Sequence, residues 1–180
     1  MNITTLFSTT KRVRILDHLL KHPSEPINMN RLAKKLGMSA GLIHKYVTIL
    51  REEGIVSGNL LVESPVVHSL RLLLNLKRIE ESNVLGKLRK HFKKAKGIGI
   101  YGSWAKGTNK EDADLDVIIR TAIEQEDITV AKARKELSQA IGAPVDIVIA
   151  TPERLKHFRE KSDAFYFSLY NSITLWGEGL

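Results

Sequence analysis

The spacing of apolar residues changes near Lys96, and this change limits the folds open to the chain. Before Lys96, apolar residues recur at intervals of three and four, as they do on one face of a helix. After it, the short apolar runs GIGIYGS, LDVIIR and PVDIVIA are interrupted by one amphipathic stretch at residues 127–141, which predicts strands around a helix. We therefore expect a helical first part and a mixed second part.

Three helices are predicted in the first part, at about residues 10–22, 29–36 and 40–53. Asn28 and Ser39 are good N-caps for the second and third, and Gly37 and Gly54 follow the last helical residues. The residues expected to face inward are Ile15, Leu16, Leu19, Leu20, Met29, Leu32, Ala33, Leu36, Ile43, Val47 and Leu50.

After Gly54, the stretch IVSGNLLVESPVV predicts two short strands around a polar turn at residues 57–59. Together with the three helices it resembles a winged helix-turn-helix domain over about residues 8–66. That resemblance implies that the third helix enters the major groove of DNA. The residues it would present are Ser39, Ala40, Gly41, His44, Lys45 and Thr48. The same module can serve dimerisation or protein docking instead, so a homodimer is left open.

Charge is divided unevenly along the chain. Residues 1–96 hold 18 Lys and Arg against 7 Asp and Glu, whereas residues 97–180 hold 10 against 13. A basic half favours a polyanionic partner, because neutralised phosphates release counterions. One alternative is RNA binding by the basic stretch at residues 84–94 without sequence preference.

Several classes of protein are excluded. The chain has no cysteine, so thiol nucleophiles and zinc ribbons are ruled out. The first residues lack the apolar core of a signal peptide, and no apolar run reaches the roughly 18 residues of a membrane helix. We expect a cytoplasmic protein with no membrane partner.

Three aspartates follow apolar signals in the second part. Asp114 and Asp116 alternate with Leu115 at the start of one strand, so they share a face, and Asp146 lies within a later apolar strand. Adjacent carboxylates repel each other unless a cation lies between them, and hard oxygen ligands suit Mg²⁺. If the two strands are neighbours, the three carboxylates converge on a metal site.

The segments GIYGSWAKGTNKEDADLDVII and PVDIVI share one order of motifs: Gly102–Ser103 after an apolar strand, then Asp-Leu-Asp, then a distant Asp in another apolar strand. This order resembles the nucleotidyltransferase superfamily of DNA polymerase beta. The likeness is strongest to its minimal nucleotidyltransferase branch and covers about residues 80–180. Together, the two resemblances imply an α+β protein with a winged helix-turn-helix at 1–66, a helical linker at 67–79, and a nucleotidyltransferase domain with a mixed sheet at 80–180.

The resemblance also implies a mechanism. Asp114, Asp116 and Asp146 would be catalytic residues that hold two Mg²⁺ ions, while Gly102, Ser103 and Lys106 would bind the nucleoside triphosphate, with ATP favoured. Pyrophosphate would leave as AMP passes to a hydroxyl of a protein or nucleic acid. A relative modifies a toxin in this way, so a toxin partner is considered. The alternative is a DNA-binding transcription regulator that senses nucleotide without turnover.

Overall fold

The computed structural model describes residues 2–161, 164–169 and 171–179. It divides into two compact units, Met1–Arg71 and Leu72–Leu180, with the division inside α5 (Pro65–Glu81). No described helix has the length and apolar character needed to cross a membrane. The mixed α+β class is confirmed, with a helical N-terminal region and a four-stranded sheet in the second unit.

The first unit is built from short helices with clear ends. They are α1 (Ile3–Phe7), α2 (Thr10–Lys21), α3 (Met29–Leu36) and α4 (Ala40–Glu52). The side chains of Asn28 and Ser39 accept hydrogen bonds from Arg31 N and Leu42 N, as expected of N-caps. Gly37 ends α3 in the left-handed conformation, at φ +65°. The predicted three helices are confirmed.

A small wing follows α4. Strands β1 (Val56–Ser57) and β2 (Leu60–Leu61) pair in antiparallel fashion around the predicted turn. The prediction of strand beyond Leu61 is wrong for residues 65–67, because α5 already begins at Pro65. Ser64 accepts a hydrogen bond from Val67 N through its Oγ, and a proline is well tolerated in the first turn of a helix.

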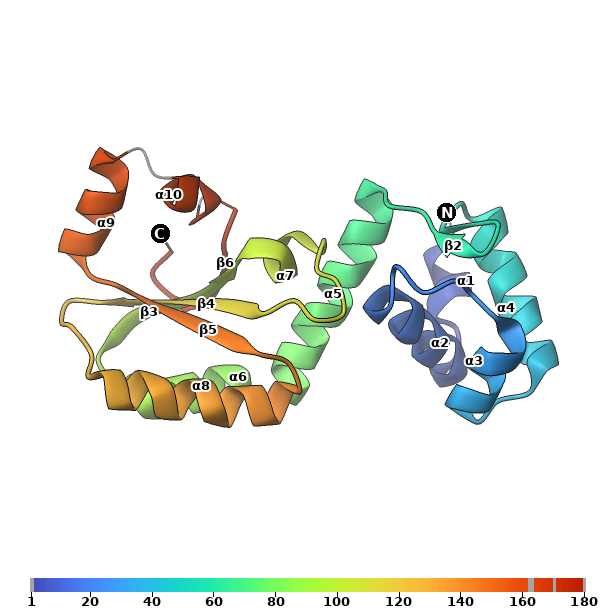
Figure 1. The fold of residues 1–180 in the computed structure, drawn as a ribbon, viewed down its shortest axis with the longest axis horizontal. Coiled ribbons are helices and arrows are strands. Elements are labelled where there is room, and N and C mark those ends of the chain that lie inside the picture. Colours follow the sequence, from blue (N-terminus) through green and yellow to red (C-terminus); the bar gives the residue numbers. More distant parts are fainter. Residues whose placement is uncertain (1, 162–163, 170, 180) are drawn as a thin grey trace. The chain divides into compact units, whose positions relative to one another are not determined.

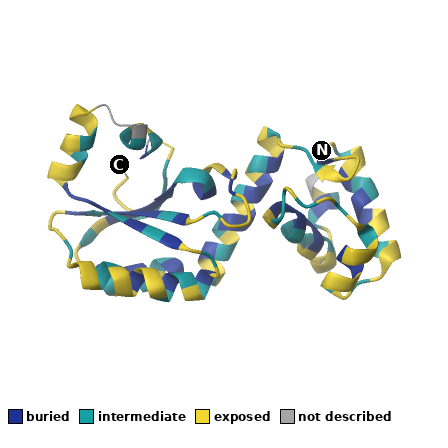
Figure 2. Cartoon of the chain, viewed as in Figure 1, coloured by how far each residue is buried: buried dark blue, intermediate teal, exposed yellow. Residues whose placement is uncertain are grey.

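The core of the first unit contains one aromatic residue that the periodic pattern did not indicate. Tyr46 on α4 is fully buried beside Ile43, Val47 and Leu50, and its hydroxyl donates to Leu6 O at 2.9 Å. This bond links α4 to α1, which sequence analysis did not predict at all. Figure 2 shows the buried positions gathered on the inner sides of these helices.

The second unit is a mixed sheet in the order β5-β4-β3-β6. Its strands are β3 (Ala95–Tyr101), β4 (Leu115–Thr121), β5 (Val145–Ala150) and β6 (Ile173–Gly177). β4 and β5 are parallel and joined by α8 (Asp127–Ile141), whereas β3 is antiparallel to both β4 and β6. The predicted strands and the helix at 127–141 are confirmed.

Helices lie on both faces of this sheet (Figure 1). One face packs against α6 (Val84–His91) and α8, and the main hydrophobic core forms there. After β3 comes α7 (Gly102–Lys106), whose Trp104 and Ala105 belong to this main core. Near the other face lie α9 (Pro152–Glu160) and α10 (Ala164–Leu169). A smaller cluster of Tyr101, Ile118, Ala150 and Leu169 fills part of that second face, which leaves its two ends to polar side chains.

Candidate active site

The predicted aspartates begin the two parallel strands. Leu115 and Val117 in β4, like Val145 and Ile147 in β5, point into the main core. Because side chains alternate along a strand, Asp116 and Asp146 point to the opposite face. The register pairs Asp116 directly with Asp146. The condition set by the sequence analysis, that the two aspartate-bearing strands are neighbours, is therefore met.

Negative charge accumulates at this end of the sheet. Asp114 is exposed just before β4, and Asp116 and Asp146 are half-buried. The pKa of Asp116 is raised from 3.8 to about 6, first by burial and then by the neighbouring charges of Asp146 and Asp114. The cluster thus disfavours its own ionisation, and a bound cation would remove that penalty.

Arg134 on α8 already neutralises one member of the trio. Its Nη2 lies 2.7 Å from Asp146 Oδ1 and also donates to Ile147 O at 3.1 Å. Sequence analysis missed this arginine, because only the crossover between β4 and β5 brings α8 to the carboxylate. In the described structure the oxygens of Asp114, Asp116 and Asp146 do not all lie within 4.8 Å of one another. An ion held by all three would require these side chains to move closer together.

Gly102 closes the site from the side of β3. Tyr101, the last residue of β3, pairs with Asp116 in the sheet, and Gly102 then starts α7 at φ +69°. A Cβ atom built on Gly102 would overlap Asp116 Oδ2. Glycine is thus required twice here, by the backbone angle and by the close approach of the carboxylate.

Tyr101 is buried beside these carboxylates. Burial, followed by the charges of Asp116 and Asp146, raises the pKa of its hydroxyl. Its ring packs edge-on against Phe165 of α10, with the ring centroids 5.5 Å apart. Tyr101 therefore remains protonated near neutral pH and connects the aspartate end of the sheet to α10.

The other predicted nucleotide residues lie on α7. Ser103 is half-buried in the first turn, next to Gly102, whereas Lys106 is exposed at the last residue of the helix. Trp104 is almost completely buried, and its Nε1 donates to Ala113 O at 3.0 Å, so this ring packs in the core and is not available to stack on a base.

Two buried asparagines anchor the loop between α7 and β4. Asn75 Nδ2 donates to Trp104 O at 3.0 Å and to Asn109 Oδ1 at 2.8 Å. Both side chains are more than nine-tenths buried, where an unpaired amide would be costly. The pair holds the segment that leads to Asp114, and nothing in the spacing of the sequence indicated it.

The family follows from this geometry and a direct comparison. Residues 81–170, half of the chain, match the model of the nucleotidyltransferase domain. The chain belongs to the nucleotidyltransferase family. Residues 9–57, upstream of this nucleotidyltransferase domain, match the model of a winged helix-turn-helix DNA-binding domain. No curated protein matches the chain.

Solved structures share parts of the fold at low similarity. A toxin–antitoxin structure with AMP-PNP is 22% identical, with a TM-score of 0.43 over 54% of this chain and 73% of that one. The tri-AMPylated Shewanella oneidensis HEPN toxin in complex with MNT antitoxin gives 20% identity and a TM-score of 0.39 over 59% and 73%. A Sulfolobus solfataricus nucleotidyltransferase structure gives 14% and 0.37 over 62% and 87%.

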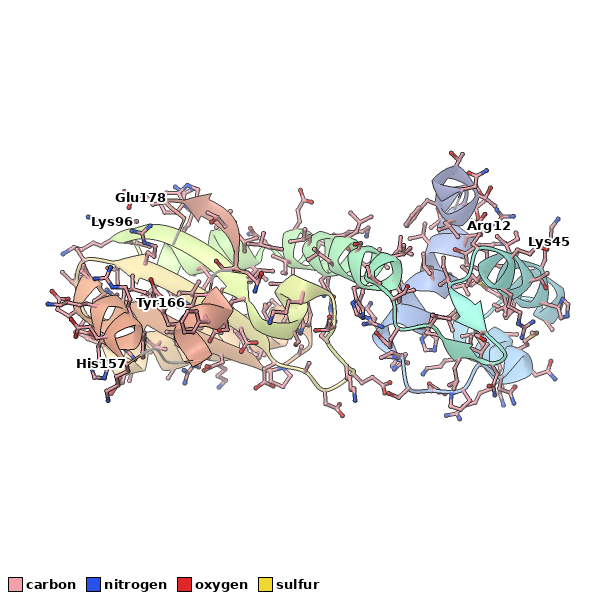
Figure 3. All side chains as sticks on the ribbon, turned by 90° about the horizontal axis from the view of Figure 1, so that it is seen from above. Arg12, Lys45, Lys96, His157, Tyr166 and Glu178 are labelled. Carbon is pink, nitrogen blue, oxygen red and sulfur yellow. The ribbon has the colours of Figure 1, made fainter. Side chains whose placement is uncertain are left out.

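The candidate DNA-binding residues occupy one side of α4. Ser39, Ala40, Gly41, His44 and Lys45 are exposed, and Thr48 is half-buried. They lie opposite the buried Ile43, Val47 and Leu50, and Figure 3 shows Lys45 projecting from the helix. The side chains are small or singly charged, which suits contact with phosphates better than extensive reading of bases.

Proposed function

We propose that the chain transfers a nucleoside monophosphate from a nucleoside triphosphate to a hydroxyl group and releases pyrophosphate. The observation that carries the proposal is the register of Asp116 opposite Asp146 with Gly102 packed against Asp116. In a nucleotidyltransferase domain, this places three carboxylates beside a glycine-bearing turn into a helix.

Asp114, Asp116 and Asp146 would hold two Mg²⁺ ions. The donor set fits, since all three offer hard oxygen atoms. The raised pKa of Asp116 reflects its burial and then the charges of Asp146 and Asp114, and a cation would offset both. When bound, such ions neutralise the phosphates and make the acceptor hydroxyl easier to deprotonate. Asp146 would also accept the proton of the acceptor hydroxyl once its carboxylate is released from Arg134.

Gly102 and Ser103 would position the triphosphate. Their backbone follows β3 directly beside Asp116, so phosphates bound there lie next to the carboxylates. Lys106 is exposed at the end of the same helix and would balance part of the phosphate charge. Tyr101, whose pKa is raised first by burial, precedes this turn at the end of β3.

We propose ATP as the nucleotide substrate and a protein or nucleic acid as the acceptor, with a toxin-like partner protein as one form. The winged helix would bind DNA through Ser39, Ala40, Gly41, His44, Lys45 and Thr48. Such binding would keep the transferase near its own gene or near its acceptor. A homodimer would suit a symmetric DNA site.

A second candidate is a DNA-binding regulator that senses nucleotide without turnover. The match of residues 9–57 to a winged helix-turn-helix DNA-binding model favours it. It differs from the transferase in one requirement: the second domain would bind nucleotide without transferring label, while sequence-specific DNA binding would survive loss of the carboxylates.

The deciding experiment follows label from alpha-labelled ATP, GTP, CTP and UTP with Mg²⁺ into lysate of host cells. A protein or RNA band that appears with the wild type and is lost with Asp114→Asn/Asp116→Asn supports transfer. Nucleotide binding with no difference between the two proteins, together with DNA binding that both retain, supports the regulator instead.

A further inference from the structure

A cavity of about 670 Å³ lies at the opposite end of the sheet face that carries the aspartates. Its walls come from the start of β3, the ends of β4, β5 and β6, and from α9 and α10. All of these elements belong to the nucleotidyltransferase domain. The volume lies within the usual range for pockets that hold small molecules.

Positive charge dominates the lining. The cavity is lined by Lys96, Arg120, Lys156 and Arg159, and among the described residues Glu178 is the one carboxylate in its walls. Arg120 lies 3.5 Å from Glu178, and Lys156 lies 3.8 Å from Glu160. Lys96 and Arg159 form no ion pair with any residue of the described chain. A concave surface with excess cations attracts an anion.

The rest of the lining is apolar and aromatic. Leu155 on α9 and Leu169 on α10 contribute aliphatic surface, and Tyr166 adds a ring. Figure 3 labels Tyr166 on α10 together with Lys96 and Glu178 from the sheet edge. The chemistry of the walls therefore suits a ligand with a phosphate at one end and a flat apolar group at the other, because bases stack on aromatic side chains.

The cavity is separate from the aspartate site. Arg120 and Asp116 are four residues apart on the same face of β4, which corresponds to about 13 Å along a strand. Between them lies the cluster of Ile118, Ala150 and Leu169. A ligand in the cavity thus does not need the metal-binding carboxylates.

We propose that this cavity binds a nucleoside monophosphate unit. Its phosphate contacts Lys96, Arg120 and Arg159, and its base packs against Tyr166. The unit is either a free mononucleotide or the 5′-terminal nucleotide of an RNA strand. This site is additional to the nucleotide site of the proposed transferase and does not depend on turnover.

The test measures binding by the full chain in EDTA, so that no metal supports the aspartate site. The probes are AMP, adenosine, inorganic phosphate, and a short single-stranded RNA with and without a 5′-phosphate. We expect AMP to bind and adenosine to bind at least about tenfold more weakly, since adenosine lacks the charge-assisted contacts. The 5′-phosphorylated RNA should bind more tightly than AMP if the ligand is an RNA end, and more weakly than AMP if the ligand is a free nucleotide.

Matched variants locate the site. Lys96→Gln/Arg159→Gln removes two exposed cavity cations and should weaken AMP about tenfold, whereas Lys93→Gln/Lys94→Gln removes the same charge outside the cavity and should not. Tyr166→Leu is a second variant that keeps all charges. It should weaken the binding of AMP but not the binding of inorganic phosphate. The proposal is overturned if no phosphorylated probe binds, if adenosine binds as tightly as AMP, or if the two double variants lose affinity for AMP to the same extent.

Discussion

The two parts of the chain present their candidate functional residues in different ways. In the winged helix, the six candidates occupy residues 39–48, on and beside one short helix, α4. In the nucleotidyltransferase domain, Gly102, Asp116 and Asp146 come from three elements that only the sheet register brings together. We therefore expect the first arrangement to tolerate the loss of any one member and the second to depend on each.

The energetic consequences differ as well. Most of the α4 candidates are exposed, so presenting them costs little stability. Asp116 is half-buried beside two other carboxylates, and its raised pKa records an unfavourable free energy of ionisation. A site assembled from long-range contacts therefore lowers the stability of the fold, whereas a site displayed on one helix does not.

The largest effect is expected for Asp116→Asn. If Asp116 holds metal as proposed, its loss should lower transfer by at least about 10³-fold, because charge stabilisation at the reacting phosphate is lost. Initial rates with labelled ATP measure it. Asp112→Asn is the matched control, since Asp112 is exposed two residues before Asp114 and makes the same charge change. Equal rates in the two variants would contradict the assigned role of Asp116.

The next largest effect is expected for Gly102→Ala. The added Cβ would overlap Asp116 Oδ2, and the alanine would also have to adopt φ +69°. We expect about a 100-fold loss of activity and a loss of about 2 kcal/mol in the free energy of unfolding, measured by kinetics and urea unfolding. The ATP concentration at half-maximal rate should rise with it.

The control for this prediction lies in the winged helix. Gly37 has φ +65°, close to that of Gly102, but a Cβ built on it would meet nothing within 4 Å. Gly37→Ala should therefore cost only about 1 kcal/mol of backbone strain and leave transfer unchanged. If Gly37→Ala reduces transfer as much as Gly102→Ala, contact with Asp116 is not the cause.

The same difference explains which features could be predicted from the sequence. Helix boundaries in the first unit follow from local signals such as the caps Asn28 and Ser39. The strands that carry Asp116 and Asp146 follow from strand alternation and apolar runs, whereas their pairing comes from the structure. The start of α5 at Pro65 was mispredicted, because apolar residues 60–67 fit a strand as well as a helix. There the Ser64 cap decided the outcome.

Features that depend on distant pairs could not be predicted. α1 is too short for a periodic pattern, and it is held by the bond from Tyr46 to Leu6 O. Arg134 reaches Asp146 from α8, and Asn75 reaches Asn109 from α5, through contacts that no spacing encodes. The basic cavity likewise combines the ends of four strands with two helices.

A smaller effect concerns stability without metal. Because the pKa of Asp116 is raised to about 6, the folded protein keeps a proton that the unfolded chain loses near pH 4. This carboxyl therefore makes the folded state less stable as pH rises from about 4 to 7. Asp116→Asn should escape that decline and gain about 1 kcal/mol at pH 7, a value reduced for solvent screening.

Thermal unfolding in EDTA from pH 4 to 7 measures this as the difference between wild type and variant. Other titrating groups, including Glu63 and Glu136 with lowered pKa values, are common to both proteins and cancel. Mg²⁺ at pH 7 should raise the melting temperature of the wild type more than that of the variant. A difference that does not change with pH would mean that Asp116 does not titrate in this range.

The smallest effect is expected on α4. Lys45→Ala removes one exposed cation from a surface of six candidates, so affinity for DNA should fall only about threefold to tenfold, with a salt dependence lower by about one ion. Titrations of labelled DNA at several salt concentrations measure both quantities. Lys132→Ala makes the same change of charge on α8 of the other unit and should have no effect. A loss for Lys45→Ala as steep as that for Asp116→Asn in transfer would break the contrast, since it would mean that α4 also acts through one indispensable contact.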